Sequence, residues 1–266
     1  MKPLRVALMQ LSAGTDVDRN LAKVDELLGE VSDVDLVALP EVFSARGKHD
    51  DYVNSAEPIP GPATEHLSSI ARRLDAWILA GSIIEESAEG IYNTSVLLDR
   101  TGAIAAQYRK IHLFEAVLDN GQVIKETDTY KAGDQPVLAD IEGWKCGMSI
   151  CYDLRFPEMY RHYALQDAHL LFVPANFTQR TGRDHWETLV RARAIENQCF
   201  VVAPDQCGTN PSTGVVSHGH SMVVGPWGEI LCCAGDAERV ITVELDPKEI
   251  AATRARIPVI EHRKLL

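Results

Sequence analysis

Residues 146–157 read Cys-Gly-Met-Ser-Ile-Cys-Tyr-Asp-Leu-Arg-Phe-Pro, an apolar run that stops at a thiol shortly before a proline. The run 146–150 has the length and composition of a buried strand. Pro157 suits the first turn of a helix, where its missing N–H is no loss. Cys151 is therefore expected on a turn from a strand to a helix, where ligand-binding and catalytic groups of α/β sheets collect.

Similar apolar runs recur along the chain and alternate with helical patterns, which predicts a layered α/β fold. Several runs are apolar almost throughout, as in sheets covered on both faces. No linker or repeat divides the chain, so we expect one domain over residues 1–266. Strands are predicted at 6–11, 36–39, 77–84, 94–99, 103–108, 146–150, 170–173, 200–203, 221–224 and 240–245, and helices at 18–29, 63–74, 157–166, 185–198 and 247–256.

The composition restricts the class of protein. Hydrophobic residues make up 45% of the 266 residues and charged residues 24%, which argues against a disordered chain. The 26 basic and 38 acidic residues give a net charge of −12. An acidic chain is poorly suited to nucleic acid, because affinity for the phosphate backbone depends on basic residues. Nucleic acid is therefore not an expected partner.

Targeting signals and cysteine usage favour a cytoplasmic protein. No apolar window is long enough to cross a bilayer. The N-terminal apolar stretch is interrupted by Arg5 and Gln10, unlike a signal peptide. Six cysteines without a CxxC pair indicate free thiols in a reducing compartment, and those other than Cys151 are expected to be buried. The nine histidines form no metal-binding pattern, so no metal is expected.

Two further polar groups follow predicted strands as Cys151 does. Glu41 comes directly after Pro40, which cannot extend a strand ladder. Lys110 follows the apolar run that ends at Tyr108. Taken singly, each of these residues is most often a solvated charge or a small buried thiol. At the ends of neighbouring strands, a carboxylate, an ammonium and a thiol would converge.

The surrounding sequence resembles the nitrilase superfamily of carbon–nitrogen hydrolases over essentially the whole chain. The matching strings occur in the family's order. They are Leu-Pro-Glu at 39–41, Tyr-Arg-Lys-Ile-His-Leu-Phe at 108–114, Ser-Ile-Cys-Tyr-Asp-Leu-Arg-Phe-Pro-Glu at 149–158, His-Trp-Glu at 185–187, Arg-Ala-Arg-Ala-Ile-Glu-Asn at 191–197 and Gly-His-Ser-Met-Val-Val at 219–224.

The resemblance implies a four-layer α-β-β-α sandwich that forms a homodimer or a higher oligomer and uses no metal or organic cofactor. It makes Cys151 the nucleophile, Glu41 the general base and then acid, and Lys110 the cationic stabiliser. Glu126 matches the family's second glutamate, in a variable loop. The implied path is attack on the amide, loss of ammonia to leave a thioester, and hydrolysis by water.

Three further residues are expected around the reacting group. The backbone N–H of Tyr152 would join Lys110 in stabilising the oxyanion; losing one such donor typically costs about 2.7–4 kcal/mol. Asn176 and Phe177 lie just past a predicted strand end and are expected to face the acyl pocket.

The residues after the nucleophile resemble the amidase and carbamoylase branches rather than true nitrilases. The strings 196–203 and 206–208 are most similar to deaminated-glutathione amidases, with ω-amidases of short 2-oxo dicarboxylates nearly as good a match. The expected partners are therefore water and a small amide bearing a carboxylate. Hydrolysis of N-carbamoyl compounds or of aliphatic amides stays an alternative.

Two other classes of function remain open. One is a thiol hydrolase in which His112 or another histidine serves Cys151, although His112 is expected to be structural. The other is a non-catalytic acidic scaffold, which the intact set of four site residues disfavours.

Two local patterns in the predicted helix 185–198 give further hypotheses. Asp184 followed by Glu187 predicts a capping box at its start. At about 100° per residue, Arg193 falls within the apolar arc around Trp186 and Val190. An inward-facing arginine needs an anionic partner, so an internal or interface ion pair is favoured over a clamp for a substrate carboxylate.

Overall fold

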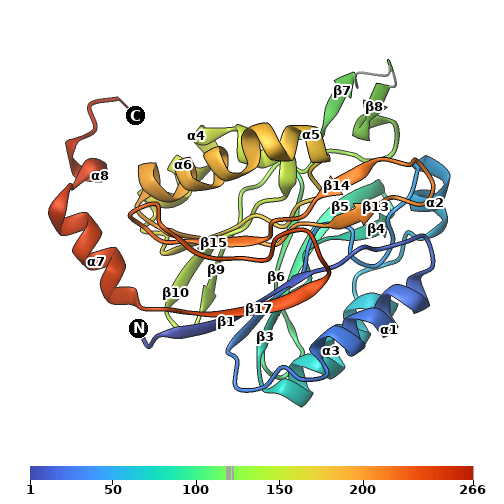
Figure 1. The fold of residues 1–266 in the computed structure, drawn as a ribbon, viewed down its shortest axis with the longest axis horizontal. Helices are drawn as coiled ribbons and strands as arrows, with labels where there is room; N and C mark the ends of the chain where they lie inside the picture. Colours follow the sequence, from blue (N-terminus) through green and yellow to red (C-terminus); the bar gives the residue numbers. More distant parts are fainter. Residues whose placement is uncertain (118–120, 122, 266) are drawn as a thin grey trace.

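Two β-sheets lie face to face between outer layers of helices in the computed structural model, which describes residues 1–117, 121 and 123–265 (Figure 1). This arrangement confirms the predicted α-β-β-α sandwich. The first sheet has the order β17 (Arg239–Leu245), β1 (Leu4–Gln10), β2 (Leu36–Ala38), β3 (Trp77–Leu79), β5 (Gly90–Leu98) and β4 (Ile83–Ser87), with β6 (Ile104–Arg109) also paired to β5. The second has the order β16 (Ile230–Cys233), β15 (Met222–Val224), β12 (Phe200–Ala203), β11 (Leu170–Phe172), β10 (Trp144–Gly147) and β9 (Leu138–Ile141).

Helices cover the outer face of each sheet (Figure 1). The first sheet carries α1 (Val17–Leu28) and α3 (Pro62–Leu74), and the second carries α4 (Pro157–Leu165) and α6 (Glu187–Asn197). Shorter elements complete the chain: α2 (His49–Asn54), α5 (Gln179–Thr181), α7 (Pro247–Arg256), α8 (Val259–His262), a π-turn at Gly182–Trp186, 3₁₀ turns at Glu126–Asp128 and Cys151–Arg155, and two-stranded ribbons β7 (Glu115–Val117) with β8 (Val123–Lys125) and β13 (Cys207–Thr209) with β14 (Val216–His218).

The first strand explains why the runs are apolar throughout. A strand sends alternate side chains to opposite faces of its sheet. In β1, Val6 and Leu8 belong to the core shared with the second sheet, whereas Ala7 and Met9 pack in the core beneath α1 and α3. Both faces of β1 are therefore buried, and no polar alternation is possible.

Strand direction brings several chain ends to one edge. In the first sheet β2 is parallel to β3, β3 is antiparallel to β5, and β5 is antiparallel to β6. The carboxyl ends of β2 and β6 therefore lie at the same edge, and they lead to Glu41 and Lys110. In the second sheet β10 and β11 are parallel, so Cys151 and Asn176 follow strands that end side by side.

Several element boundaries differ from those predicted. The single strand expected at 77–84 is two strands, β3 and β4, because Gly81 has φ +43° and packs against the carbonyl group of Pro40. The strand predicted at 146–150 ends at Gly147, and the strand predicted at 94–99 begins at Gly90, where it pairs with β4. The thiol of Cys233 is exposed rather than buried, because it lies in an edge strand.

The predicted capping box at Asp184 is wrong. The helical segment begins at Gln179, and Asp184 lies inside the π-turn that leads into α6. Its carboxylate accepts a hydrogen bond from the side chain of Arg183 instead of capping a helix. The prediction that Pro157 occupies the first turn of α4 is confirmed.

Gly147 gives a direct test of packing beneath the nucleophile. A Cβ atom at Gly147 would lie 2.6 Å from the Tyr163 ring, so Gly147→Ala should lower the free energy of unfolding by about 1–3 kcal/mol. Gly14→Ala is the matched control, because its Cβ would meet no atom closer than 3.9 Å. Urea denaturation compares the two variants, and equal midpoints would contradict this packing.

Candidate active site

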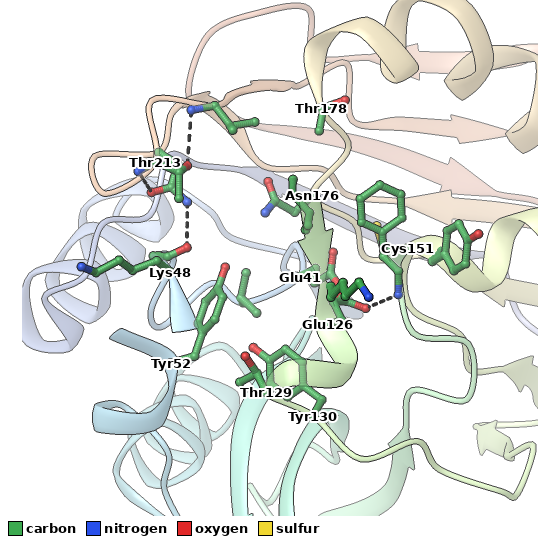
Figure 2. Close-up of a pocket in the computed structure, with 18 of the residues that line it drawn as sticks. Glu41, Lys48, Tyr52, Glu126, Thr129, Tyr130, Cys151, Asn176, Thr178 and Thr213 are labelled. Atoms are coloured by element: carbon green, nitrogen blue, oxygen red, sulfur yellow. Dashed lines mark hydrogen bonds between the residues drawn. The ribbon is translucent and has the colours of Figure 1, made fainter. Parts of the chain in front are cut away.

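A pocket of about 290 Å³ opens at the edge where these strands end (Figure 2). Its lining includes six of the seven predicted site residues: Glu41, Glu126, Cys151, Tyr152, Asn176 and Phe177. The seventh, Lys110, is fully buried and contacts two of the lining carboxylates. The fold thus brings together side chains that are far apart in the sequence.

Lys110 lies between two carboxylates. Its Nζ is 2.9 Å from Glu41 Oε1 and 2.8 Å from the carboxylate of Glu126. Asn93 Nδ2 also donates to Glu41 Oε1, at 2.9 Å, and the backbone N–H of Phe114 donates to Glu126 Oε2 at 2.7 Å. Each carboxylate therefore has a second donor that holds it toward the ammonium.

Hydrogen bonds to their backbones position Lys110 and Glu41. The N–H of Lys110 donates to the Asn93 carbonyl, which continues the pairing of β5 with β6 beyond Arg109. Gln206 Nε2 donates to the carbonyl oxygen of Glu41 at 2.9 Å. The backbone of Lys110 is thus held by strand β5, and that of Glu41 by the Gln206 side chain from the segment between β12 and β13.

Cys151 occupies a strained turn. It has φ +48°, and a left-handed conformation costs a non-glycine residue about 1–2 kcal/mol. Its N–H donates to the Pro174 carbonyl at 2.9 Å, and Asp153 Oδ2 accepts from the N–H of Ile150 at 2.8 Å. These bonds hold the turn, and the thiol side chain faces the pocket (Figure 2).

Asp153 links the nucleophile turn to the segment that follows β6. Its fully buried carboxylate accepts from the Tyr108 hydroxyl at 2.7 Å and from His112 Nδ1 at 2.7 Å. The His112 ring also stacks on Phe156, with centroids 3.7 Å apart. His112 is thus engaged with Asp153 and does not line the pocket, which disfavours a cysteine–histidine pair.

The charges within the site set its protonation states. Burial lowers the pKa of the Lys110 ammonium, but the carboxylates of Glu126 and Glu41 outweigh burial and hold that pKa well above its usual value. Burial and then the charge of Glu41 raise the pKa of the Cys151 thiol, against the opposing effects of Lys110 and the Asn176 N–H. Burial likewise raises the pKa of Glu126, which Lys110 opposes. At neutral pH the site therefore holds an ammonium beside a neutral thiol.

Aromatic and cationic side chains surround the thiol. Tyr152 meets Phe114 edge to face, with ring centroids 5.1 Å apart, and the Arg155 guanidinium lies 5.4 Å from the centre of the Phe177 ring. Sequence reasoning did not assign Asn93, Asp153 or Arg155 to the site. Asp153 and Arg155 lie within the string 149–158 that carries the family resemblance. Their closeness to Cys151 in the sequence was therefore the signal that could have assigned them to the site.

The hypothesis for Arg193 is confirmed. Its side chain is 5% exposed, and Nη1 lies 2.7 Å from the carboxylate of Glu196. Both Nε and Nη2 donate to the carbonyl of Leu154, at 3.0 and 2.7 Å. Arg193 is absent from the pocket lining, so the structural role is the one observed: it supports the turn after Cys151 from behind.

Among residues 1–117, 121 and 123–265, no cluster of three or more His, Cys, Asp or Glu is arranged to hold a metal ion. Within the same residues, no helix has both the length and the apolar character needed to span a bilayer.

Comparison with known proteins identifies the family to which the chain belongs. Residues 5–255 match the carbon–nitrogen hydrolase family, and the chain belongs to that family. It is 37% identical to the deaminated glutathione amidase of Synechocystis sp., over 99% of both chains, and 34% identical to the omega-amidase NIT2 of Bos taurus, over 99% of this chain and 96% of the relative. The structure of the C. elegans NitFhit protein has a TM-score of 0.93 at 31% identity, covering 99% of this chain and 66% of that one.

The electrostatic coupling in the site predicts how the Cys151 thiol titrates. Removing the negative charge of Glu41 favours the thiolate, so Glu41→Gln should move alkylation of Cys151 by iodoacetamide to lower pH. Lys110→Gln removes a positive charge and should move it to higher pH. Alkylation followed by peptide mass spectrometry measures both, and the exposed Cys233 is an internal control. A shift to higher pH in Glu41→Gln would refute the coupling.

Proposed function

We propose that this carbon–nitrogen hydrolase is a thiol amidase that acts on small amides bearing a carboxylate, such as deaminated glutathione or the ω-amide of a 2-oxo dicarboxylic acid. It releases cysteinylglycine from the first and ammonia from the second. The observation that carries the proposal is the buried Lys110 ammonium between Glu41 and Glu126, next to a pocket that contains Cys151. The names of the two relatives support the same substrate class.

The first half of the proposed reaction forms a thioester. Glu41 takes the thiol proton as the sulfur of Cys151 bonds to the amide carbon, because the neutral thiol is a weak nucleophile. The carbonyl oxygen becomes an oxyanion, stabilised by the Lys110 ammonium and the Tyr152 backbone N–H. Glu41 then returns the proton to the nitrogen, the C–N bond breaks, and the free amine leaves, which is ammonia for a primary amide.

The second half regenerates the thiol. A water molecule loses a proton to Glu41 and adds to the thioester carbon, passing through the same oxyanion position. The C–S bond breaks, the carboxylic acid product departs, and Glu41 returns its proton to the sulfur. Glu126 keeps Lys110 protonated throughout and orients the amide, so its proposed role is electrostatic.

The charges of the pocket rim support a substrate with a carboxylate. Three basic residues line the pocket: Lys48, Lys125 and Arg155. Apart from the catalytic glutamates, the acidic residue among the described lining residues is Asp128. Lys125 pairs with Glu115 at 3.2 Å, whereas no carboxylate among the described residues pairs with Arg155. Asn176 and Phe177 are proposed to contact the acyl chain between this rim and the thiol.

A homodimer in the cytoplasm completes the proposal. Leu165 at the end of α4, Ile195 on α6 and Trp227 nearby are exposed by 41%, 49% and 49% on the outer layer of the second sheet. A second copy packed on this layer would remove their apolar surface from water. The six unpaired cysteines support a reducing compartment.

Ammonia release from a panel of amides tests the proposed activity. The purified protein should release ammonia from 2-oxo dicarboxylic acid ω-amides or cysteinylglycine from deaminated glutathione, and Cys151→Ala should release neither because the nucleophile is lost. Simple aliphatic amides and N-carbamoyl amino acids form the rest of the panel. Activity confined to N-carbamoyl compounds would replace the amidase with a carbamoylase.

His112→Asn in the same assay separates a Cys–Glu–Lys site from a cysteine–histidine pair. Because His112 is bonded to Asp153, this variant should retain ammonia release. Its complete inactivation with the fold intact would favour the histidine mechanism, and no release by the unaltered protein from any compound would favour the scaffold.

A further inference from the structure

A chain of hydrogen bonds runs from a buried arginine to the pocket wall. Arg46 Nη1 donates to Ser217 Oγ at 2.8 Å, and Ser217 Oγ donates to Asn176 Oδ1 at 2.6 Å. Arg46 is fully buried and Ser217 is 6% exposed, whereas the Asn176 side chain projects into the pocket (Figure 2). The three residues come from the loop after β2, from β14 and from the segment after β11.

The chemistry of the guanidinium gives this chain a direction. An arginine side chain can only donate hydrogen bonds, so the oxygen of Ser217 accepts from Arg46 and its single hydrogen is free for another acceptor. The acceptor within reach is Asn176 Oδ1. With that oxygen engaged, the NH₂ group of Asn176 is the part of the amide left for a ligand.

Among the described residues, the NH₂ group of Asn176 has no hydrogen-bond partner of its own. Asn176 and Cys151 line the same pocket. The pocket thus presents an oriented donor close to the position of the acyl group.

Further hydrogen bonds hold the Arg46 guanidinium in the orientation that directs Ser217 toward Asn176. The other donors of its guanidinium bind the carbonyls of Ala13 and Cys207, at 3.0 Å each, and Ser12 Oγ at 2.9 Å. All of these acceptors are neutral, and no carboxylate of the described residues forms an ion pair with the guanidinium, so its positive charge polarises the Ser217 hydroxyl toward Asn176. A substrate with an ammonium group facing Asn176 would meet the NH₂ donor of its amide, with the buried Arg46 cation behind it. This arrangement disfavours a positively charged substituent there.

We propose that Arg46 and Ser217 are positioning residues that fix the Asn176 amide with its NH₂ group toward the acyl chain, so that the pocket selects an amide with an acceptor oxygen at C2. This inference rests on the proposed amidase function and assigns its preference for a 2-oxo group to these three residues. Asn176 and Cys151 follow the neighbouring parallel strands β11 and β10 and line the same pocket, so the oriented amide faces the space that the acyl chain would occupy.

Four ω-amides that differ only at C2 test the assignment: 2-oxoglutaramate, 2-hydroxyglutaramate, glutaramate without a C2 substituent, and glutamine. The unaltered protein should have its highest kcat/KM for the 2-oxo compound. Ser217→Ala frees the Asn176 amide to rotate, and the ratio of kcat/KM between the 2-oxo compound and glutaramate should fall about tenfold, the worth of one hydrogen bond near a charge. A general loss of activity would leave this ratio unchanged.

Ser12→Ala is the matched control. It removes a hydroxyl from the same guanidinium, but Ser12 has no bond to Asn176, so the substrate ratio should stay within about twofold of the original. Asn176→Ala is the second variant, for use if Ser217→Ala does not fold, and it should also lower the ratio.

The outcomes separate this inference from the proposed function. Ammonia released by the unaltered protein, with a ratio that neither Ser217→Ala nor Asn176→Ala changes, overturns the positioning role and leaves the amidase intact. An equal loss on all four amides in both variants also overturns it, because the donor would then serve the reacting carbonyl. No ammonia from any of the four overturns this inference, and the amidase is overturned as well if deaminated glutathione is also left uncleaved.

Discussion

The buried Lys110 ammonium between two carboxylates is the interaction on which the site depends. A charged group removed from water is stable only when it is paired and hydrogen-bonded, and removing one partner of such a pair typically costs about 3–5 kcal/mol. Lys110 meets that condition through Glu41 and Glu126, and Asn93 and the Phe114 N–H satisfy the carboxylates in turn. Three distant segments of chain must therefore converge on one nitrogen atom.

The position of the nucleophile relative to this cation depends on another buried carboxylate, that of Asp153. Asp153 accepts from the Ile150 N–H, which precedes Cys151, and from His112, which follows Lys110. Arg193 supports the same turn from the opposite side through the Leu154 carbonyl. The left-handed conformation of Cys151 is thus maintained by contacts outside the pocket, which leaves the pocket lining free to bind substrate.

Local sequence was enough to predict that a strand ends shortly before Glu41 and another before Cys151, although the second already ends at Gly147. Pro40 ends β2 just before Glu41, and the apolar run before Cys151 meets a helix at Pro157; both are effects of neighbouring residues. The layered fold followed from the alternation of strands and helices, and the four-layer arrangement from the family resemblance. These predictions needed no knowledge of long-range contacts.

Features that depend on tertiary contacts could not be predicted in this way. The break between β3 and β4 results from the approach of Gly81 to Pro40, and the helix predicted from Asp184 begins earlier because the π-turn carries the chain through that residue. The chain from Arg46 through Ser217 to Asn176 joins three separate segments, none of which carries a recognisable motif. Its existence depends on the pairing of β13 with β14 beside the pocket.

The central claim is that an acyl group is held on Cys151 as a thioester while Lys110 and Glu41 serve the reacting carbonyl. Mass spectrometry of the protein quenched in acid during turnover tests it most directly, because it reports the modified residue and the acyl mass together. The expected result is a mass increase on the Cys151 peptide equal to the acyl part of the amide, absent from Cys151→Ala. Ammonia release with no adduct on Cys151, or with the adduct on another residue, would contradict the claim.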